Sequence, residues 1–69
     1  MKLSARNVIR GTVREIDMNA VNADVTVEIA PGVEMSSIIT KKSCESLELK
    51  PGKKVYLIIK ASSVIIGAD

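Results

Sequence analysis

Histidine, tryptophan and phenylalanine are absent from this 69-residue sequence, which has one tyrosine and one cysteine. Without histidine, a general base near neutral pH would have to be a strongly perturbed carboxylate or lysine. The one thiol has no histidine or second cysteine to activate it, and the four glycines are too scattered to form a phosphate-binding loop. We therefore expect no catalysis.

The lone cysteine, Cys44, limits how so short a chain can be stabilised. A monomer of this size buries only about 60% of the surface of its unfolded chain, and such domains commonly rely on disulfides, a structural metal or oligomerisation. One cysteine cannot form an internal disulfide, and without histidine there is no set of zinc ligands. We interpret Cys44 as a small buried apolar residue. Because 46% of the residues are hydrophobic, we predict a homo-oligomer.

Long hydrophobic runs and polybasic tails are also absent. Arg6, Asn7 and Arg10 interrupt the N-terminal apolar residues, so no signal peptide is predicted, and no run approaches the roughly 20 apolar residues of a membrane span. Together with the unpaired thiol, this predicts a cytoplasmic protein without a membrane partner. Ten basic and eight acidic residues, with basic doublets only at 41–42 and 53–54, indicate a mixed, solvated surface.

β-Branched and alternating segments predict a mostly β fold. Residues 23–29 alternate apolar and polar side chains as in a half-buried strand, and residues 8–16 are predicted to pair with them as a hairpin. Gly11 marks a bulge or a close backbone approach in the first of these strands. Three more strands are expected, the last two of them central in a sheet or pressed against a partner subunit. They cover residues 33–40, 55–59 and 64–66.

A short helix is predicted between the third and fourth strands. Ser43 is its expected N-cap, Glu45 is expected in the first turn, and Leu47 and Leu49 are expected to face inward. The order β-β-β-α-β-β predicts a single domain over residues 1–69, a small, partly closed five-stranded barrel of the OB type with one short helix.

The OB type of barrel raises the possibility of nucleic-acid binding. Such barrels bind single strands by stacking bases on aromatic side chains within a basic groove. Tyr56 is the only aromatic residue of this chain, so a nucleic-acid partner is not expected. It remains an alternative, as does a purely structural interaction module.

Hydrogen-bond donors gather in three stretches that contain no aspartate or glutamate. These donors are Ser4, Arg6 and Asn7, then Thr40 and Ser43, then Lys60, Ser62 and Ser63. If the fold or the assembly brings the stretches together, hydroxyls, backbone N–H groups and two cations would form a pocket suited to an oxyanion. The same residues can equally serve as helix caps, turns and strand-edge residues.

Several segments together resemble the molbindin (Mop) family of small cytoplasmic molybdate-binding proteins. They are "SARN" followed by "VIRGTV", then "AVNADVTVEIAPG", "SSIITKKS" and "KPGKKVYLIIKASSVII", and they cover nearly the whole chain. The resemblance implies an OB-like barrel that assembles as a hexamer, a trimer of dimers. It also implies that molybdate or tungstate binds at subunit interfaces for molybdenum storage or homeostasis, with no organic cofactor.

The resemblance further implies nine oxyanion-binding residues, which supply hydroxyls, backbone N–H groups or positive charge. They are Ser4, Ala5, Arg6, Asn7, Thr40, Ser43, Lys60, Ala61 and Ser62. Molybdate at neutral pH is a dianion whose oxygens only accept hydrogen bonds, and a site of donors and two cations matches it. Protonated phosphate would leave its O–H without an acceptor, at a cost of about 1–3 kcal/mol.

Overall fold

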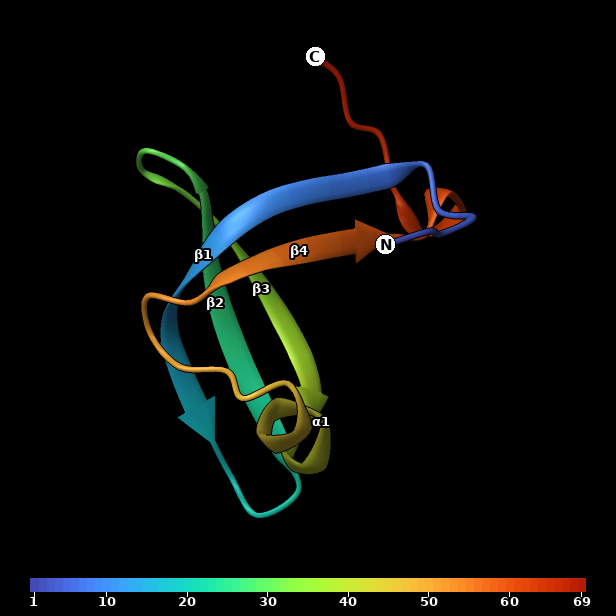
Figure 1. The fold of residues 1–69 in the computed structure, drawn as a ribbon. Helices are drawn as coiled ribbons and strands as arrows, with labels where there is room; N and C mark the ends of the chain where they lie inside the picture. The colour runs from blue at the N-terminus through green and yellow to red at the C-terminus, as the bar shows by residue number, and fades with distance from the viewer.

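The computed structural model describes all residues from Met1 to Asp69. Its elements are β1 (Asn7–Met18), β2 (Asn22–Ala30), β3 (Val33–Thr40), α1 (Lys41–Ser46), β4 (Lys54–Ile59) and the 3₁₀ turn η1 (Ala61–Ser63). This arrangement confirms the mostly β class and the predicted order of elements as far as residue 59 (Figure 1). No helix has the length and apolar character needed to cross a membrane.

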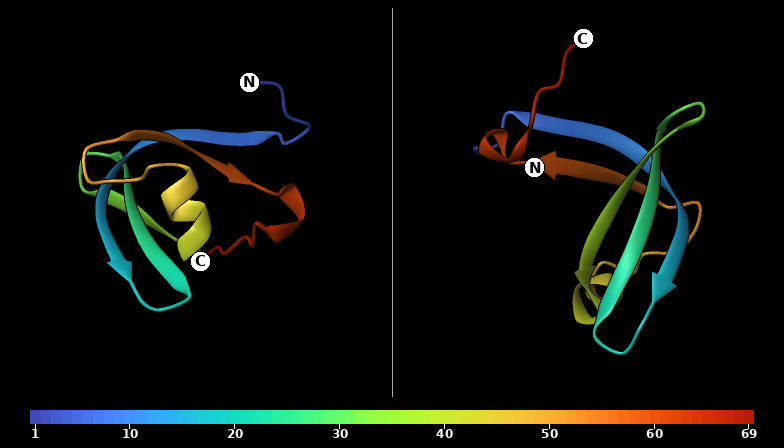
Figure 2. Two further views of the ribbon diagram at one scale, coloured as in Figure 1. Left: turned by 60° about the horizontal axis from the view of Figure 1, so that its bottom comes forward. Right: turned by 180° about the vertical axis from the view of Figure 1, so that it is seen from behind.

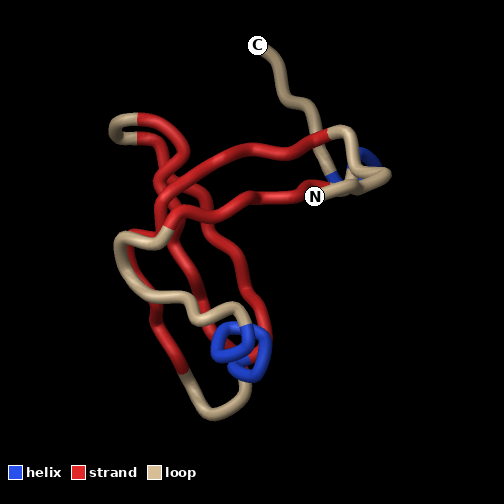
Figure 3. The backbone as a smooth tube through the Cα atoms, in the orientation of Figure 1, coloured by secondary structure: helices blue, strands red, loops and turns tan.

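All four strands belong to one antiparallel sheet, in the order β3-β2-β1-β4. β1 joins two parts of the molecule, because residues 7–12 pair with β4 and residues 12–18 pair with β2. Figure 1 shows residues 7–12 and β4 extending to one side as a two-stranded arm, which we call the ribbon. The rest of β1, with β2, β3 and α1, is called the body. Figure 3 shows the same division in the course of the backbone.

Gly11 lies where the ribbon leaves the body. A Cβ atom at this position would lie 2.9 Å from the carbonyl oxygen of Glu28 and closer still to the side chain of Val27. Only glycine fits between the strands here, so the predicted close backbone approach is confirmed. A β-bulge follows between Val13 and Glu15, and bulges bend a strand and increase its twist. Glycine and bulge together allow β1 to turn from one partner strand to the other.

The hydrophobic core lies entirely in the body. Its five buried residues are Val13, Ala23, Val25, Val27 and Cys44. Alternation along β2 directs three of these side chains to one face, and α1 packs over β2 and β3 so that Cys44 joins them (Figure 2). The prediction that Cys44 is a buried apolar residue is confirmed.

The start of α1 differs from the prediction. Thr40, and not Ser43, is the N-cap: its backbone is extended and its hydroxyl oxygen accepts a hydrogen bond from the Ser43 N–H at 3.0 Å. Two candidate cap residues stand three positions apart, and the first one that ends a strand takes the role. The helix therefore starts at Lys41, which moves Glu45 out of the first turn.

The end of α1 is closed by a Schellman motif. The Glu48 N–H donates to the Glu45 carbonyl at 3.0 Å, and the Leu49 N–H donates to the Cys44 carbonyl at 3.1 Å. Glu48 has the left-handed backbone that this motif requires, with φ of 53°. Leu49 packs against the core as predicted, but Leu47 is 58% exposed, because the helix ends before it and the chain reverses direction.

The last strand of the prediction does not form. β4 is an edge strand and not a central one, and η1 redirects the chain directly after it. Residues 64–66 have no regular structure, and Ile65 and Ile66 are 93% and 89% exposed. A strand requires a neighbour to pair with, and these residues extend away from every strand of their own chain (Figure 1). The chain thus forms a four-stranded sheet where five strands were expected.

The molecule exposes more surface than its size requires. A monomeric protein of 7.4 kDa exposes roughly 4,200 Å², whereas this chain exposes 5664 Å². Its radius of gyration is 12.9 Å, compared with roughly 11 Å for a compact domain of this length. The ribbon and the C-terminal residues account for this extended shape, because both project from the body (Figure 2).

Candidate functional site

Pairing of β1 with β4 brings two of the three donor-rich stretches together. Asn7 is opposite Ile59 in the antiparallel register, so residues 4–7 enter β1 beside the point where residues 60–62 leave β4. These stretches are more than 50 positions apart in sequence, yet they share the free end of the ribbon (Figure 1). Arg6 and Lys60, the two predicted cations, therefore belong to one surface.

The predicted donors at this end are accessible. Ser4, Arg6, Lys60, Ala61 and Ser62 are exposed, whereas Ala5 and Asn7 are half-buried. The side-chain hydrogen bonds of the structure are made elsewhere, by Asn19, Lys53, the Thr40–Ser43 pair and the Lys54–Thr12 pair. The hydroxyls and cations at the free end of the ribbon are thus available to a ligand or a second chain.

Thr40 and Ser43, the third predicted stretch, lie at the other end of β1. Thr40 is opposite Asn22, and the neighbouring part of β2 pairs with the last residues of β1, where Met18 is opposite Ala23. A strand of 12 residues is roughly 36 Å long when straight. α1 lies against the lower part of the body and η1 at the free end of the ribbon, on different arms of the bent molecule (Figures 1 and 2). One chain therefore does not unite all nine predicted site residues.

The hydroxyls of Thr40 and Ser43 are joined by a hydrogen bond. Thr40 Oγ1 donates to Ser43 Oγ at 2.8 Å while it accepts from the Ser43 backbone N–H. The proton of Thr40 is used within the pair, so the Ser43 hydroxyl retains its own proton for an outside acceptor. Thr40 thus holds Ser43 in place, and Ser43 is the donor that this pair can offer to an anion.

Charges of opposite sign are segregated along the chain, a feature that the predicted mixed surface did not include. Residues 1–14 and 49–68 contain four Lys or Arg each and no Asp or Glu, whereas residues 15–48 contain seven Asp or Glu and two Lys. Arg10 and Lys54 of these segments lie in the ribbon and Arg6 and Lys60 flank its free end, so the ribbon carries cations without acids, whereas most acids lie in the body. The missing acids in both terminal segments are the signal that could have revealed this.

Comparison with known proteins identifies the family. The TOBE domain family matches residues 3–66. A probable molybdenum-pterin-binding protein of Haemophilus influenzae is 42% identical over 69 residues, and the match covers the full length of both chains. Molybdenum-pterin-binding protein 3 of Clostridium pasteurianum is 39% identical over 66 residues, which are 96% of this chain and 97% of the relative.

Solved structures agree with these sequence matches. A molybdate-binding protein from Sporomusa ovata is 35% identical, with a TM-score of 0.92 over 99% of this chain and all of the other. The cytoplasmic molybdate-binding protein ModG, with molybdate bound, is 46% identical with a TM-score of 0.94; this chain is covered completely and spans 49% of ModG. The resemblance expected from the "SARN" and "KASS" segments is confirmed, and the chain belongs to the TOBE domain family, among the small molbindin (Mop) proteins.

Proposed function

We propose that this protein binds molybdate, and tungstate as its close analogue, between subunits of a cytoplasmic homo-oligomer that stores or buffers molybdenum without catalysis. The observation that carries the proposal is the β1–β4 register, which places Arg6 and Lys60 with several neutral donors at one end of the ribbon. The relatives named for binding molybdate or a molybdenum pterin support the choice of ligand.

The chemistry of this end of the ribbon suits a proton-free oxyanion. Two cations balance the charge of a tetrahedral dianion, and the hydroxyls of Ser4 and Ser62 with the backbone N–H groups around Ala5 and Ala61 can donate to its oxygens. No carboxylate lies in residues 1–14 or 49–68 to repel the anion or to accept from a protonated one. Sulfate has the same charge and shape, so it is the competitor that the binding experiment must include.

The separation of the predicted residues indicates that the site spans two chains. Arg6 and Lys60 lie at the free end of the ribbon, whereas Thr40 and Ser43 lie at the far end of the body. A pocket that uses all of them takes the ribbon of one subunit and the start of α1 of another. Oligomerisation and oxyanion binding are then one event.

The surface of the isolated chain supports such an assembly. Its accessible area exceeds that of a compact monomer by roughly 1,500 Å², and a standard interface buries about 800 Å² per partner. Ile65 and Ile66 are almost fully exposed in a segment that the sequence predicted as a strand. Added to the sheet of a neighbour, this segment would supply the missing strand of an OB-like barrel, in the hexamer that the family resemblance implies.

Isothermal titration with molybdate tests the proposal, with sulfate and phosphate as competitors and light scattering of the same sample for oligomer size. We expect tight molybdate binding that equimolar sulfate does not displace, together with an oligomer. An oligomer that gives no heat with any oxyanion would instead identify a structural interaction module.

Removing either cation should weaken binding. Arg6→Ala and Lys60→Ala each remove one of the two cations that balance the dianion, which costs about 2 kcal/mol or more, or about 30-fold in Kd. Titration of each variant measures the effect, and Lys50→Ala, another exposed lysine far from this end of the ribbon, is the matched control. Unchanged Kd in both site variants would refute the assignment.

A further inference from the structure

The outer face of the ribbon is a ladder of cross-strand pairs that has no partner in its own chain. β1 and β4 place Val8 opposite Ile58, Arg10 opposite Tyr56, and Thr12 opposite Lys54. Alternation directs these six side chains to one side, and the opposite side carries Val55 and Leu57, which pack against the core. The ladder combines exposed apolar groups with two cations, and Val8 and Ile58 are 41% and 48% exposed.

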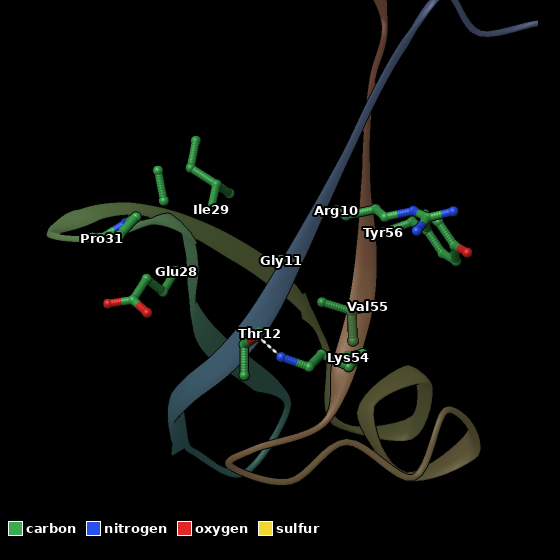
Figure 4. Close-up of a pocket in the computed structure, with 10 residues that line it drawn as sticks. Arg10, Gly11, Thr12, Glu28, Ile29, Pro31, Lys54, Val55 and Tyr56 are labelled. Carbon is green, nitrogen blue, oxygen red and sulfur yellow. Dashed lines mark hydrogen bonds between the residues drawn. The ribbon is translucent and has the colours of Figure 1, made fainter.

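Contacts within the ladder hold its cations in place. The Arg10 guanidinium lies 5.7 Å from the centroid of the Tyr56 ring, and Lys54 Nζ donates to Thr12 Oγ1 at 2.9 Å. Figure 4 shows both pairs beside the crossing at Gly11, with Glu28 and Pro31 on the other side of β1. Together with the β2–β3 turn they line an open groove of about 530 Å³. Two cations, Arg10 and Lys54, outnumber the one carboxylate of the lining, Glu28, so the groove suits an acidic and partly apolar occupant.

The chain itself contains a segment of that chemistry at the end of α1. Glu45 and Glu48 are exposed there and flank Leu47, whose side chain is more than half exposed. The Schellman motif fixes this segment, and Lys53 Nζ donates to the Leu47 carbonyl at 2.6 Å. A leucine between two carboxylates, held on a rigid backbone, complements a surface of apolar side chains between two cations.

We propose that the segment Glu45–Glu48 of a second copy of this chain docks on the outer face of the ribbon, a contact that rests on the proposed interface site. Its carboxylates lie beside Arg10 and Lys54, and Leu47 packs on the exposed apolar side chains of the ladder. The docking surface and its occupant both belong to this sequence, and they carry opposite charge.

The dimensions of the two surfaces agree. Along the ribbon, the step from the position of Arg6 and Lys60 to that of Arg10 and Tyr56 is four residues, or roughly 13 Å. Along α1, the step from Thr40 to Leu47 is seven residues, or roughly 10 Å. A copy whose Thr40 lies beside the cations at the free end of the ribbon therefore has Leu47 and its flanking carboxylates near the Arg10–Tyr56 pair.

Charge at the other end of the same contact gives the oxyanion a second role. α1 begins with Lys41 and Lys42, which would approach Arg6 and Lys60 of the ribbon. Four cations repel one another unless a counter-charge lies between them, and a bound dianion supplies it. The oxyanion should therefore strengthen this contact. The pairing of Glu45 and Glu48 with Arg10 and Lys54 requires no ligand.

Nucleic acid is a less suitable occupant of the ladder. Single strands require several stacking platforms, and Tyr56 is the one aromatic residue, already covered by Arg10. Val8 and Ile58 present aliphatic groups where phosphates would lie. Exposed aliphatic side chains between cations are better matched by a protein surface.

Charge reversal tests the contact. The variants are Arg10→Glu, Glu45→Arg and the double variant, with Glu34→Arg on β3 and Lys50→Glu as matched controls outside the contact. Analytical ultracentrifugation with and without molybdate gives the association constant, circular dichroism checks folding, and titration gives the molybdate Kd. We expect each single reversal to lower association at least tenfold, the double variant to recover most of the loss, and the controls to match the wild type.

The possible failures are distinct. If wild type assembles and binds molybdate but both reversals associate as wild type does, the docking contact is wrong and the proposed function stands. If the double variant is as weak as the sum of the single variants, the two residues do not meet and the contact is also wrong. If wild type is monomeric and binds no oxyanion, both proposals fail. Tight, salt-sensitive binding of a single-stranded oligonucleotide that Arg10→Glu abolishes would assign the ladder to nucleic acid and overturn the contact.

Discussion

The body and the ribbon are built from the same sheet but are stabilised differently. The body contains all five buried residues, a capped helix and six of the eight acids. The ribbon has two strands, one apolar face exposed in part, and no acid. A two-stranded ribbon is marginally stable in water unless something packs on it. The body therefore folds around its own core, whereas the ribbon leaves its outer face uncovered within one chain.

The largest effect is expected in the core of the body. Val25 is 2% exposed, and Val25→Ala removes two buried methyl groups and leaves a cavity, so we expect a loss of about 2–3 kcal/mol in unfolding free energy. Urea denaturation at fixed, low protein concentration measures it. Ile58→Ala on the ribbon is the matched comparison and should cost the dilute chain less than about 1 kcal/mol. Equal losses at both positions would contradict the division into body and ribbon.

The junction between the two regions should be the next most sensitive. Gly11→Ala pushes a methyl group against the Glu28 carbonyl and the Val27 side chain, and the strands can separate only by disturbing both regions. We expect a loss of about 1–3 kcal/mol, as in other overpacked sites, measured by thermal unfolding. Gly67→Ala, with nothing within 4 Å of the added Cβ, is the control. An unchanged melting temperature for Gly11→Ala would show that the strands at this position leave room for a methyl group.

A smaller effect is expected at the start of α1. Thr40→Ala removes the cap and the acceptor for the Ser43 N–H, at a cost of about 1 kcal/mol. Thr40→Ser keeps the hydroxyl and should retain most of the stability. Because Thr40 also holds Ser43 in place, the alanine variant should weaken molybdate binding as well, which titration can detect. Stability lost without any change in Kd would limit Thr40 to the helix cap.

The smallest effect is a gain at the end of α1. Glu48 adopts φ of 53° in the Schellman motif, a conformation that glycine reaches without strain. Glu48→Gly should therefore stabilise the chain by up to about 1 kcal/mol, observed as a higher urea midpoint. Glu48→Ala removes the same carboxylate but keeps Cβ, so it should show no gain. Equal stability of the two variants would show that the backbone at this position is not under strain.

Sequence patterns predicted those features that depend on neighbouring residues. The alternation in residues 23–29, a helix near Ser43 and the buried Cys44 all follow from local periodicity and composition, and all are present. The resemblance carried by "SARN", "KASS" and the segments between them also predicted the family correctly. The N-cap was misplaced because Thr40 and Ser43 have the same local chemistry, and only the end of β3 decides between them.

By itself, the sequence thus determined where strands can form, which residues can donate to an anion, and that no acid accompanies the cations of the two terminal segments. The tertiary structure decided which of these residues meet. The β1–β4 register joined residues 4–7 to residues 60–62, and the length of β1 separated them from Thr40 and Ser43. Strand pairing depends on contacts distant in sequence, as the unpaired residues 64–66 show: their apolar pattern is that of a strand, but no neighbour exists for it within one chain.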